Sequence, residues 1–466
     1  MNFSILLLLV AAGPASDVDP LRSVTLTGFP HIKQKPDFCG EADVAMALQR
    51  LGHDVSQDQV FAATGLDPAK GRGAYTDDLS RGLRALGVEP GRVWYRIDPK
   101  QAAAQVDVQW RAVHADLVKG QPSIVCMHYD SQPKTTEHFR LVTGYDAATD
   151  EVIYQEPAED DGANRRMARE AFIKLWVFKP SPTRWTMIRF KLPAPAKAPV
   201  LPVEVTPTAA EVAQHVMTLK PTLPPNSTLV WEKPFLVVGN ESVDQVRERA
   251  KTLIRRERDL LLKDFFVDPP MVLQEVWVLK DKASYEKYSK ELFNINPDTP
   301  YGYYLSERRA LVMNIKPGYG TLTHELFHPF FHQAWPDGPA WLNEGVASLF
   351  EQPAERDGHF IGKVNWRLPG LLAGFRAGQV PSFKTLVHLS TNGFYADDYG
   401  LHYATARYLC YWLQERGVLA KFVRRAIELK AVDPSGWKAL EEVLGADPES
   451  FRPEWETFTK ALQRGS

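Results

Sequence analysis

The chain has 466 residues and a formal net charge of -2, with 44% hydrophobic and 24% charged residues. With this net charge, the protein has no positive electrostatic field to attract the phosphates of a nucleic acid. The charge therefore argues against a nucleic-acid partner. The length exceeds the size at which one core usually keeps growing, so the ordinary composition predicts a globular protein of two domains.

The N-terminus is apolar but short. Residues 5–12 are too few to span a bilayer, and small residues follow at Gly13, Ala15 and Ser16. This pattern predicts a signal peptide over residues 1–16. We therefore expect a secreted or periplasmic protein with no integral membrane segment after the signal peptide is removed.

A cysteine opens the first predicted helix. The helical pattern that follows Cys39 stops at Gly52, so Cys39 falls in the first turn, where the helix dipole favours a thiolate. Gln34 is close enough in sequence to offer its amide to an oxyanion. Two other interpretations remain for Cys39: a small buried hydrophobe, or a disulfide with Cys126.

Two predicted strands bring a histidine and a carboxylate together. The sequence predicts two strands, at residues 138–145 and 151–157, joined by a polar turn. Folding this hairpin places Glu156 opposite His138 or its neighbour. A carboxylate there would orient the imidazole, so Cys39, His138 and Glu156 fit the roles of nucleophile, base and orienter.

These features resemble the papain-like cysteine peptidases of the bacteriocin leader-processing type, over roughly residues 25–180. The matching pieces are Gln34, Cys39-Gly40, the helix Thr76–Gly87, the strand Pro122–Met127, and His138 with Gly144-Tyr145-Asp146. The resemblance implies a papain-like domain over 25–192 with Gln34, Cys39, His138 and Glu156 as catalytic residues. Glu156 stands where the family usually has Asp, and an inactive domain that binds a peptide or a partner is the alternative.

A proline-rich segment separates the two halves. It spans residues 193–208 and predicts an extended, semi-rigid linker. The second domain, 209–466, follows. Its expected elements are a helix at 211–219, a strand at 228–238, a long helix at 242–266, a strand at 271–279, a hairpin of 301–305 with 310–315, and then mostly helices.

The strongest motif of the second half is His324-Glu325-Leu326-Phe327-His328. Histidines four residues apart leave the same face of a helix, as capture of one ion requires. Turn residues at 333–339 then lead into a second helix, and this helical hairpin brings Glu344 back toward the first. His324, His328 and Glu344 are therefore the predicted ligands of a zinc ion that keeps its fourth position for water.

The open zinc position determines the chemistry. Zinc lowers the pKa of its bound water to about 7, and Glu325 is the predicted general base that passes the proton to the leaving amine. A donor for the oxyanion is also expected. Tyr399 is the first candidate, with Tyr403 and His402 behind it.

Residues 225–466 resemble the gluzincin metallopeptidases, on the motif at 324–328 together with Trp341-Leu342-Asn343-Glu344-Gly345-Val346-Ala347. The resemblance implies a mostly helical zinc-peptidase domain with a small sheet, with Glu344 as third ligand. It also extends to Tyr399, at a position where such proteins often carry the oxyanion tyrosine. Two residues depart from the pattern: Pro329 is expected to kink or end the helix, and His332 is an alternative ligand to Glu344.

Together, the patterns predict an α+β protein of two domains that hydrolyses peptide bonds in a peptide or protein substrate. The zinc domain is the leading candidate for the activity. The alternatives are a binding or scaffold protein with vestigial sites, and a cysteine peptidase with Cys39 as the main catalyst. The oligomeric state is not set by the sequence, and the absence of a clear acidic cluster for a free amino terminus leans toward an endopeptidase.

Overall fold

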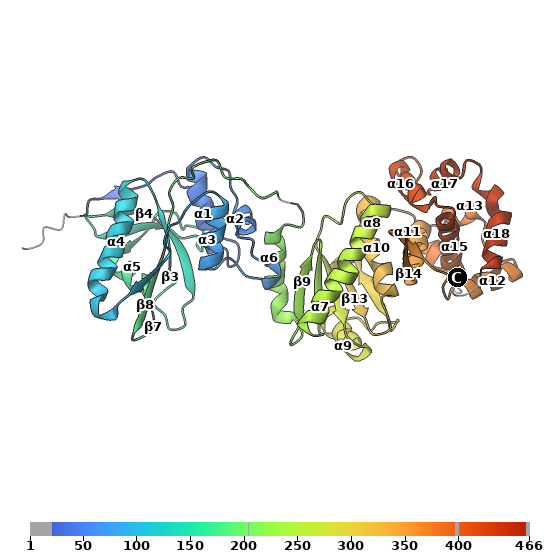
Figure 1. Ribbon diagram of the computed structural model, residues 1–466, viewed down its shortest axis with the longest axis horizontal. Helices are drawn as coiled ribbons and strands as arrows, with labels where there is room; N and C mark the ends of the chain where they lie inside the picture. The colour runs from blue at the N-terminus through green and yellow to red at the C-terminus, as the bar shows by residue number, and fades with distance from the viewer. Residues whose placement is uncertain (1–20, 204, 397–399, 463–466) are drawn as a thin grey trace, which may run out of the picture. The chain divides into compact units, whose positions relative to one another are not determined.

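The computed structural model describes residues 21–203, 205–396 and 400–462. It divides into two compact units (Figure 1). The first comprises the residues up to Leu66 and Arg72–Pro202; the second comprises Asp67–Gly71 and the chain from Val203. The boundary after Pro202 lies inside the predicted linker, and the predicted signal peptide lies outside the described residues.

An antiparallel sheet forms the centre of the first unit. Its strands are β1 (Val24–Thr25), β2 (Trp94–Ile97), β3 (Ser123–His128), β4 (Glu137–Asp146), β5 (Glu151–Gln155), β6 (Arg165–Ala168), β7 (Phe178–Ser181) and β8 (Arg184–Lys191). They are ordered β2-β8-β3-β4-β5-β6, with β1 on β4 and β7 on β8. The predicted hairpin is β4 with β5, and its register pairs Leu141 with Gln155.

Helices cover both faces of this sheet (Figure 1). They are α1 (Cys39–Arg50), α2 (Gln57–Thr64), α3 (Thr76–Ala85), α4 (Ala102–Val118) and α5 (Arg169–Trp176). Successive strand side chains alternate between the faces. Ile124 and Phe139 therefore pack with α1 to α3, whereas Val125 and Val142 pack with α4 and α5.

The second unit contains a smaller mixed sheet. Its strands are β9 (Thr228–Glu232), β10 (Phe235–Gly239), β11 (Gln274–Leu279), β12 (Gly302–Leu305) and β13 (Ala310–Asn314), in the order β12-β13-β11-β10-β9. β14 (Pro353–Arg356) and β15 (His359–Gly362) form a separate hairpin. The prediction of one strand over 228–238 was wrong. The chain turns between β9 and β10 at Lys233 and Pro234, where proline cannot donate to a strand ladder.

Helices make up most of the second unit. They are α6 (Ala209–Leu219), α7 (Val243–Arg249), α8 (Arg256–Asp264), α9 (Lys282–Phe293), α10 (Gly320–Ala334), α11 (Ala340–Ala347), α12 (Leu368–Ala377), α13 (Phe383–Val387), α14 (Thr391–Tyr395), α15 (Leu401–Glu415), α16 (Leu419–Leu429), α17 (Trp437–Leu444) and α18 (Arg452–Ala461). The long helix expected at 242–266 is α7 and α8, joined by a π-helical turn at Ala250–Arg255. Among the described residues, no helix combines the length and apolarity that a membrane crossing needs.

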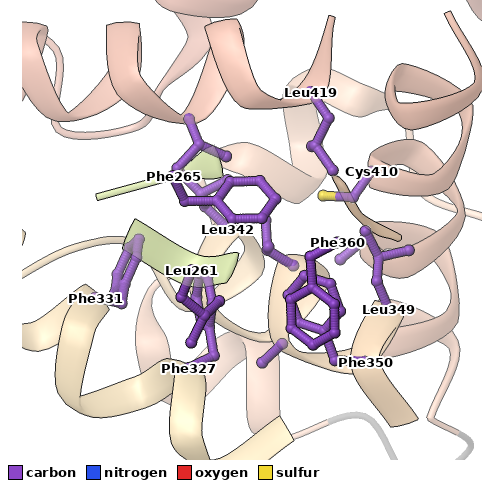
Figure 2. Close-up of a cluster of buried hydrophobic side chains, with 14 of the residues drawn as sticks. Leu261, Phe265, Phe327, Phe331, Leu342, Leu349, Phe350, Phe360, Cys410 and Leu419 are labelled. Atoms are coloured by element: carbon purple, nitrogen blue, oxygen red, sulfur yellow. The ribbon is translucent and has the colours of Figure 1, made fainter. Parts of the chain in front are cut away.

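The helix that carries the HExxH motif is anchored in the core by its apolar face. Phe327 and Phe331 of α10 pack with Leu342 of α11, with Leu261 of α8 and with Phe265, which follows α8 (Figure 2). Burial of several aromatic rings offsets the hydrogen bond that a proline inside a helix cannot make. Of the two outcomes expected at Pro329, the end of the helix was therefore wrong, because α10 continues to Ala334.

Candidate active sites

Cys39 is the first residue of α1, in the turn where the sequence predicted it. Its thiol is only partly exposed. Burial raises the pKa of this thiol, the backbone of Phe139 opposes the rise, and the nearby Glu41 and Asp43 add to it. Burial thus acts against the thiolate that the helix dipole favours, and the thiolate stays a prediction. Cys39 and Cys126 are both free cysteines, so the alternative of a disulfide between them is also wrong.

His138 and Glu156 form a buried pair. Nε2 of His138 lies 2.5 Å from Oε1 of Glu156, so this nitrogen donates and Nδ1 is left as the basic nitrogen. Burial raises the pKa of Glu156. The hydrogen bond from His138 and the charge of Arg140 lower this pKa by more, so its net shift is downward. The thiol of Cys39 is hydrogen-bonded to the backbone of Phe139, the residue that follows His138 in the chain. Within the described chain, no hydrogen bond joins the thiol to the imidazole.

Two further acids of α1 are fully buried beside Cys39. Oε1 of Glu41 accepts the backbone N–H of Ala74 at 2.7 Å, and burial raises the pKa of Glu41 to about 8. Both oxygens of Asp43 are buried without a hydrogen-bond partner, and burial raises its pKa well above the usual range. Burial therefore favours the neutral form of both carboxyl groups.

Gln34 lies beside the loop that follows β5. Its backbone N–H donates to the carbonyl of Pro157 at 2.9 Å, which fixes this residue next to Glu156. The side-chain oxygen of Gln34 is buried without a protein partner. The amide is therefore close to the predicted site, and its oxygen accepts no hydrogen bond from a protein donor.

The second site joins α10 to α11. His324, His328 and Glu344 each offer a ligand atom, and these atoms lie within 4.8 Å of one another. Nε2 of His324 lies 3.3 Å from Oε2 of Glu344, an oxygen that is buried without a hydrogen-bond partner. His332, the alternative ligand, is exposed one turn beyond His328. Two imidazoles and a buried carboxylate are a donor set that suits a zinc ion.

The outer nitrogens of both histidines face polar groups. Nδ1 of His328 lies 3.0 Å from Oδ1 of Asn343, and Nδ1 of His324 lies 3.8 Å from Oε1 of Glu351. A partner at Nδ1 orients the ring and leaves Nε2 for a metal. Sequence reasoning missed Asn343 in this role, although it directly precedes the predicted ligand Glu344.

Tyrosines complete the second site. The hydroxyl of Tyr395, at the end of α14, donates to Oε1 of Glu344 at 2.6 Å. Tyr403 lies beside it, with ring centroids 6.0 Å apart, whereas Nδ1 of His402 lies 3.1 Å from the carbonyl of Phe394. The predicted oxyanion donor Tyr399 lies outside the described residues. Sequence reasoning missed Tyr395, which no motif connects to Glu344.

Two cavities meet at this site. One of about 820 Å³ is lined by Tyr301, Trp366 and Arg367, and one of about 370 Å³ by Tyr304, His332 and Asn343. His324, Glu325, Gly302 and Tyr403 line both. Glu325 therefore lies between two cavities next to the edge strand β12.

Comparisons with known proteins concern the first unit. Residues 26–179 match the Peptidase_C39 like family. Among solved structures, the chain is similar to the peptidase domain of Streptococcus ComA, a bi-functional ABC transporter involved in a quorum-sensing pathway: 17% identity, TM-score 0.25, covering 36% of this chain and 99% of that one. It is also similar to a double glycine motif protease from an AMS/PCAT transporter in complex with the leader peptide: 19% identity, TM-score 0.23, covering 37% and 99%. No curated protein matches.

The family match over residues 26–179 supports the resemblance of the first unit to C39-like peptidases that the sequence predicted. This match supports a peptidase. It supports catalysis by cysteine better than the zinc-dependent hydrolysis that was the leading prediction from the sequence. The gluzincin resemblance of the second half stays a prediction.

Proposed function

We propose that the chain is a peptidase in which Cys39 attacks the peptide carbonyl and His138 is the general base. The observation that carries the proposal is the buried contact of His138 Nε2 with Glu156, within a domain that matches a cysteine peptidase family. This contact leaves Nδ1 of His138 to take the thiol proton. Because the thiol and imidazole are not hydrogen-bonded in the resting protein, their contact has to tighten when a substrate binds.

The steps follow from these residues. His138 takes the proton from Cys39, and the sulfur bonds to the carbonyl carbon. The oxyanion is stabilised by the Gln34 amide and by free backbone N–H groups at the start of α1. His138 then gives the proton to the leaving amine, the C–N bond breaks, and water releases the acyl group from sulfur.

The test is activity-based labelling together with cleavage of a peptide library by the full chain. We expect wild type to be labelled at Cys39, and Cys39→Ala and His138→Ala to lose cleavage sensitive to thiol reagents. Cleavage that survives in Cys39→Ala and is abolished by a chelator would contradict the proposal. An absence of any cleavage would favour the scaffold alternative.

A second candidate function is zinc-dependent peptide hydrolysis at the second site. It is favoured by the convergence of His324, His328 and Glu344, with the unpaired Oε2 of Glu344 among them. When bound, zinc would supply a polarised water and a Lewis acid for the carbonyl. Glu325 would take the proton of the attacking water and give it to the leaving amine, while Asn343 and Tyr395 would hold His328 and Glu344 in orientation.

Metal analysis tests this candidate. We expect stoichiometric zinc in wild type and its loss in His324→Ala. Chelator-sensitive cleavage in Cys39→Ala would assign that activity to the second site. A wild-type chain that takes up no zinc from a zinc-buffered solution would remove the candidate.

A further inference from the structure

Arg140 is buried beside the His138 and Glu156 pair, and the sequence analysis gave it no role. Only 4% of its surface is exposed. Nε donates to Oε2 of Glu156 at 2.6 Å, Nη2 to the carbonyl of Tyr129 at 2.9 Å, and Nη1 to the carbonyl of His128 at 3.3 Å. Protein acceptors thus fix the guanidinium on three sides, so its orientation is set before any substrate binds.

Glu156 is in turn held through both of its oxygens. Oε1 meets Nε2 of His138 at 2.5 Å and accepts the backbone N–H of Ala158 at 3.1 Å, while Oε2 accepts from Arg140. A glutamate has one more rotatable bond than an aspartate and loses more side-chain entropy when it is ordered. The contact with Arg140 removes the freedom that this longer side chain would otherwise have.

We infer that Arg140 is a positioning residue that fixes Glu156 against His138, so that a glutamate can orient the imidazole where an aspartate would be expected. The inference rests on the proposed cysteine-peptidase function. Arg140 touches neither the thiol nor the site of the scissile bond. It acts through Glu156, which keeps the proton of His138 on Nε2.

Charge reinforces this role. The titratable groups near Arg140 and Glu156 are Cys39, Glu41 and Asp43 of α1, Tyr129 after β3, His138 of β4, Tyr154 of β5, and Glu159 in the following loop. Arg140 lowers the pKa values of both Glu156 and Asp43 against the effect of burial. Without this cation, the pKa of Glu156 would rise, and Glu156 would accept a proton and release His138 at a higher pH.

The experiment follows the alkylation rate of Cys39 by iodoacetamide against pH, read by mass spectrometry on the full chain. For Arg140→Met we expect about a tenfold slower reaction near pH 6, and an acid limb displaced upward by about one pH unit. Arg140→Lys keeps the charge but cannot reach all three acceptors, so we expect an intermediate profile. The lysine variant also keeps the test open if the methionine variant does not fold.

The matched control is Arg189, a buried arginine in the same sheet that pairs away from this site. It is 7% exposed, and its Nη1 donates to Oδ2 of Asp116 at 2.9 Å. Arg189→Met should lower the melting temperature much as Arg140→Met does and leave the alkylation profile unchanged. A profile of Arg140→Met that coincides with wild type, or that Arg189→Met reproduces, would overturn the inference.

The proposed function is tested separately in the same assay. If His138→Ala has the wild-type profile, Cys39 is not activated by His138 and the proposed function fails. If His138→Ala changes the profile but Arg140→Met and Arg140→Lys do not, only the role of Arg140 fails.

Discussion

In the first unit a buried arginine stands among carboxyl groups, whereas in the second unit the carboxyl groups surround two histidines. Arg140 satisfies one oxygen of Glu156, and His138 satisfies the other. At the second site, Oε2 of Glu344 is buried without a hydrogen-bond partner. The carboxylate of the first site is therefore held by protein donors at both oxygens, whereas the carboxylate of the second site has one oxygen without a hydrogen-bond partner.

The sharpest division between the two sites is expected from Glu325→Gln. If the second site hydrolyses peptides with Glu325 as base, this change should lower its chelator-sensitive cleavage about a thousandfold and leave zinc in place. Cleavage in a Cys39→Ala background and zinc stoichiometry measure the two effects. His332→Ala should keep both the cleavage and the zinc. If zinc is lost in His332→Ala but kept in Glu344→Gln, the third ligand is His332 and not Glu344.

Charge in the first unit also predicts how its stability depends on pH. Burial raises the pKa of Glu41 to about 8, so the folded unit holds a proton that the unfolded chain releases near pH 4.5. The stabilising contribution of this proton is fully present below about pH 4.5 and is lost as pH rises from there to about 8. Between pH 5 and 7.5 the fall should be roughly 3 kcal/mol.

Glu41→Gln should flatten that dependence, because the amide oxygen still accepts from Ala74 and carries no proton to lose. Denaturant unfolding of the first unit at several pH values measures it. An unchanged slope in the variant would mean that Glu41 is ionised in the folded protein.

A third comparison concerns the thiol itself. Burial raises the pKa of Cys39, so the isolated thiol should react only at alkaline pH. If His138 takes its proton in wild type, His138→Ala should slow alkylation at pH 7 about a hundredfold and move the profile to higher pH. Labelling of Cys126, which is buried, should stay low in both proteins.

Local patterns predicted the elements that carry both sites. The helix that opens at Cys39, the β4 and β5 hairpin and the pair α10 and α11 all follow from spacing and turn residues that act over fewer than about twenty positions. The convergence of His324, His328 and Glu344 was likewise predictable, because one short turn brings Glu344 back to the two histidines.

Contacts between distant segments were not predictable. Tyr395 meets Glu344 across 51 positions, and Arg407 donates to the carbonyl of Ser348 across 59 positions. The continuation of α10 past Pro329 has a related cause: local rules kink or end a helix there, but the core around Phe327 and Phe331 stabilises its continuation. The raised pKa of Cys39 depends on burial, which the position in a first helical turn does not reveal.

The smallest expected effect tests whether the second site depends on an orienting contact as the first depends on Arg140. Tyr395→Phe removes the 2.6 Å hydrogen bond to Glu344 and should weaken zinc binding about tenfold, as loss of a contact to a metal ligand commonly does. Tyr304 lines the same cavity but donates to Gln274 at 3.2 Å, so Tyr304→Phe is the matched control and should bind zinc as wild type does. Competition against a chelating dye measures the affinities. Equal affinities in all three proteins would show that Glu344 is held without Tyr395, and that dependence on a single orienting contact is confined to the first site.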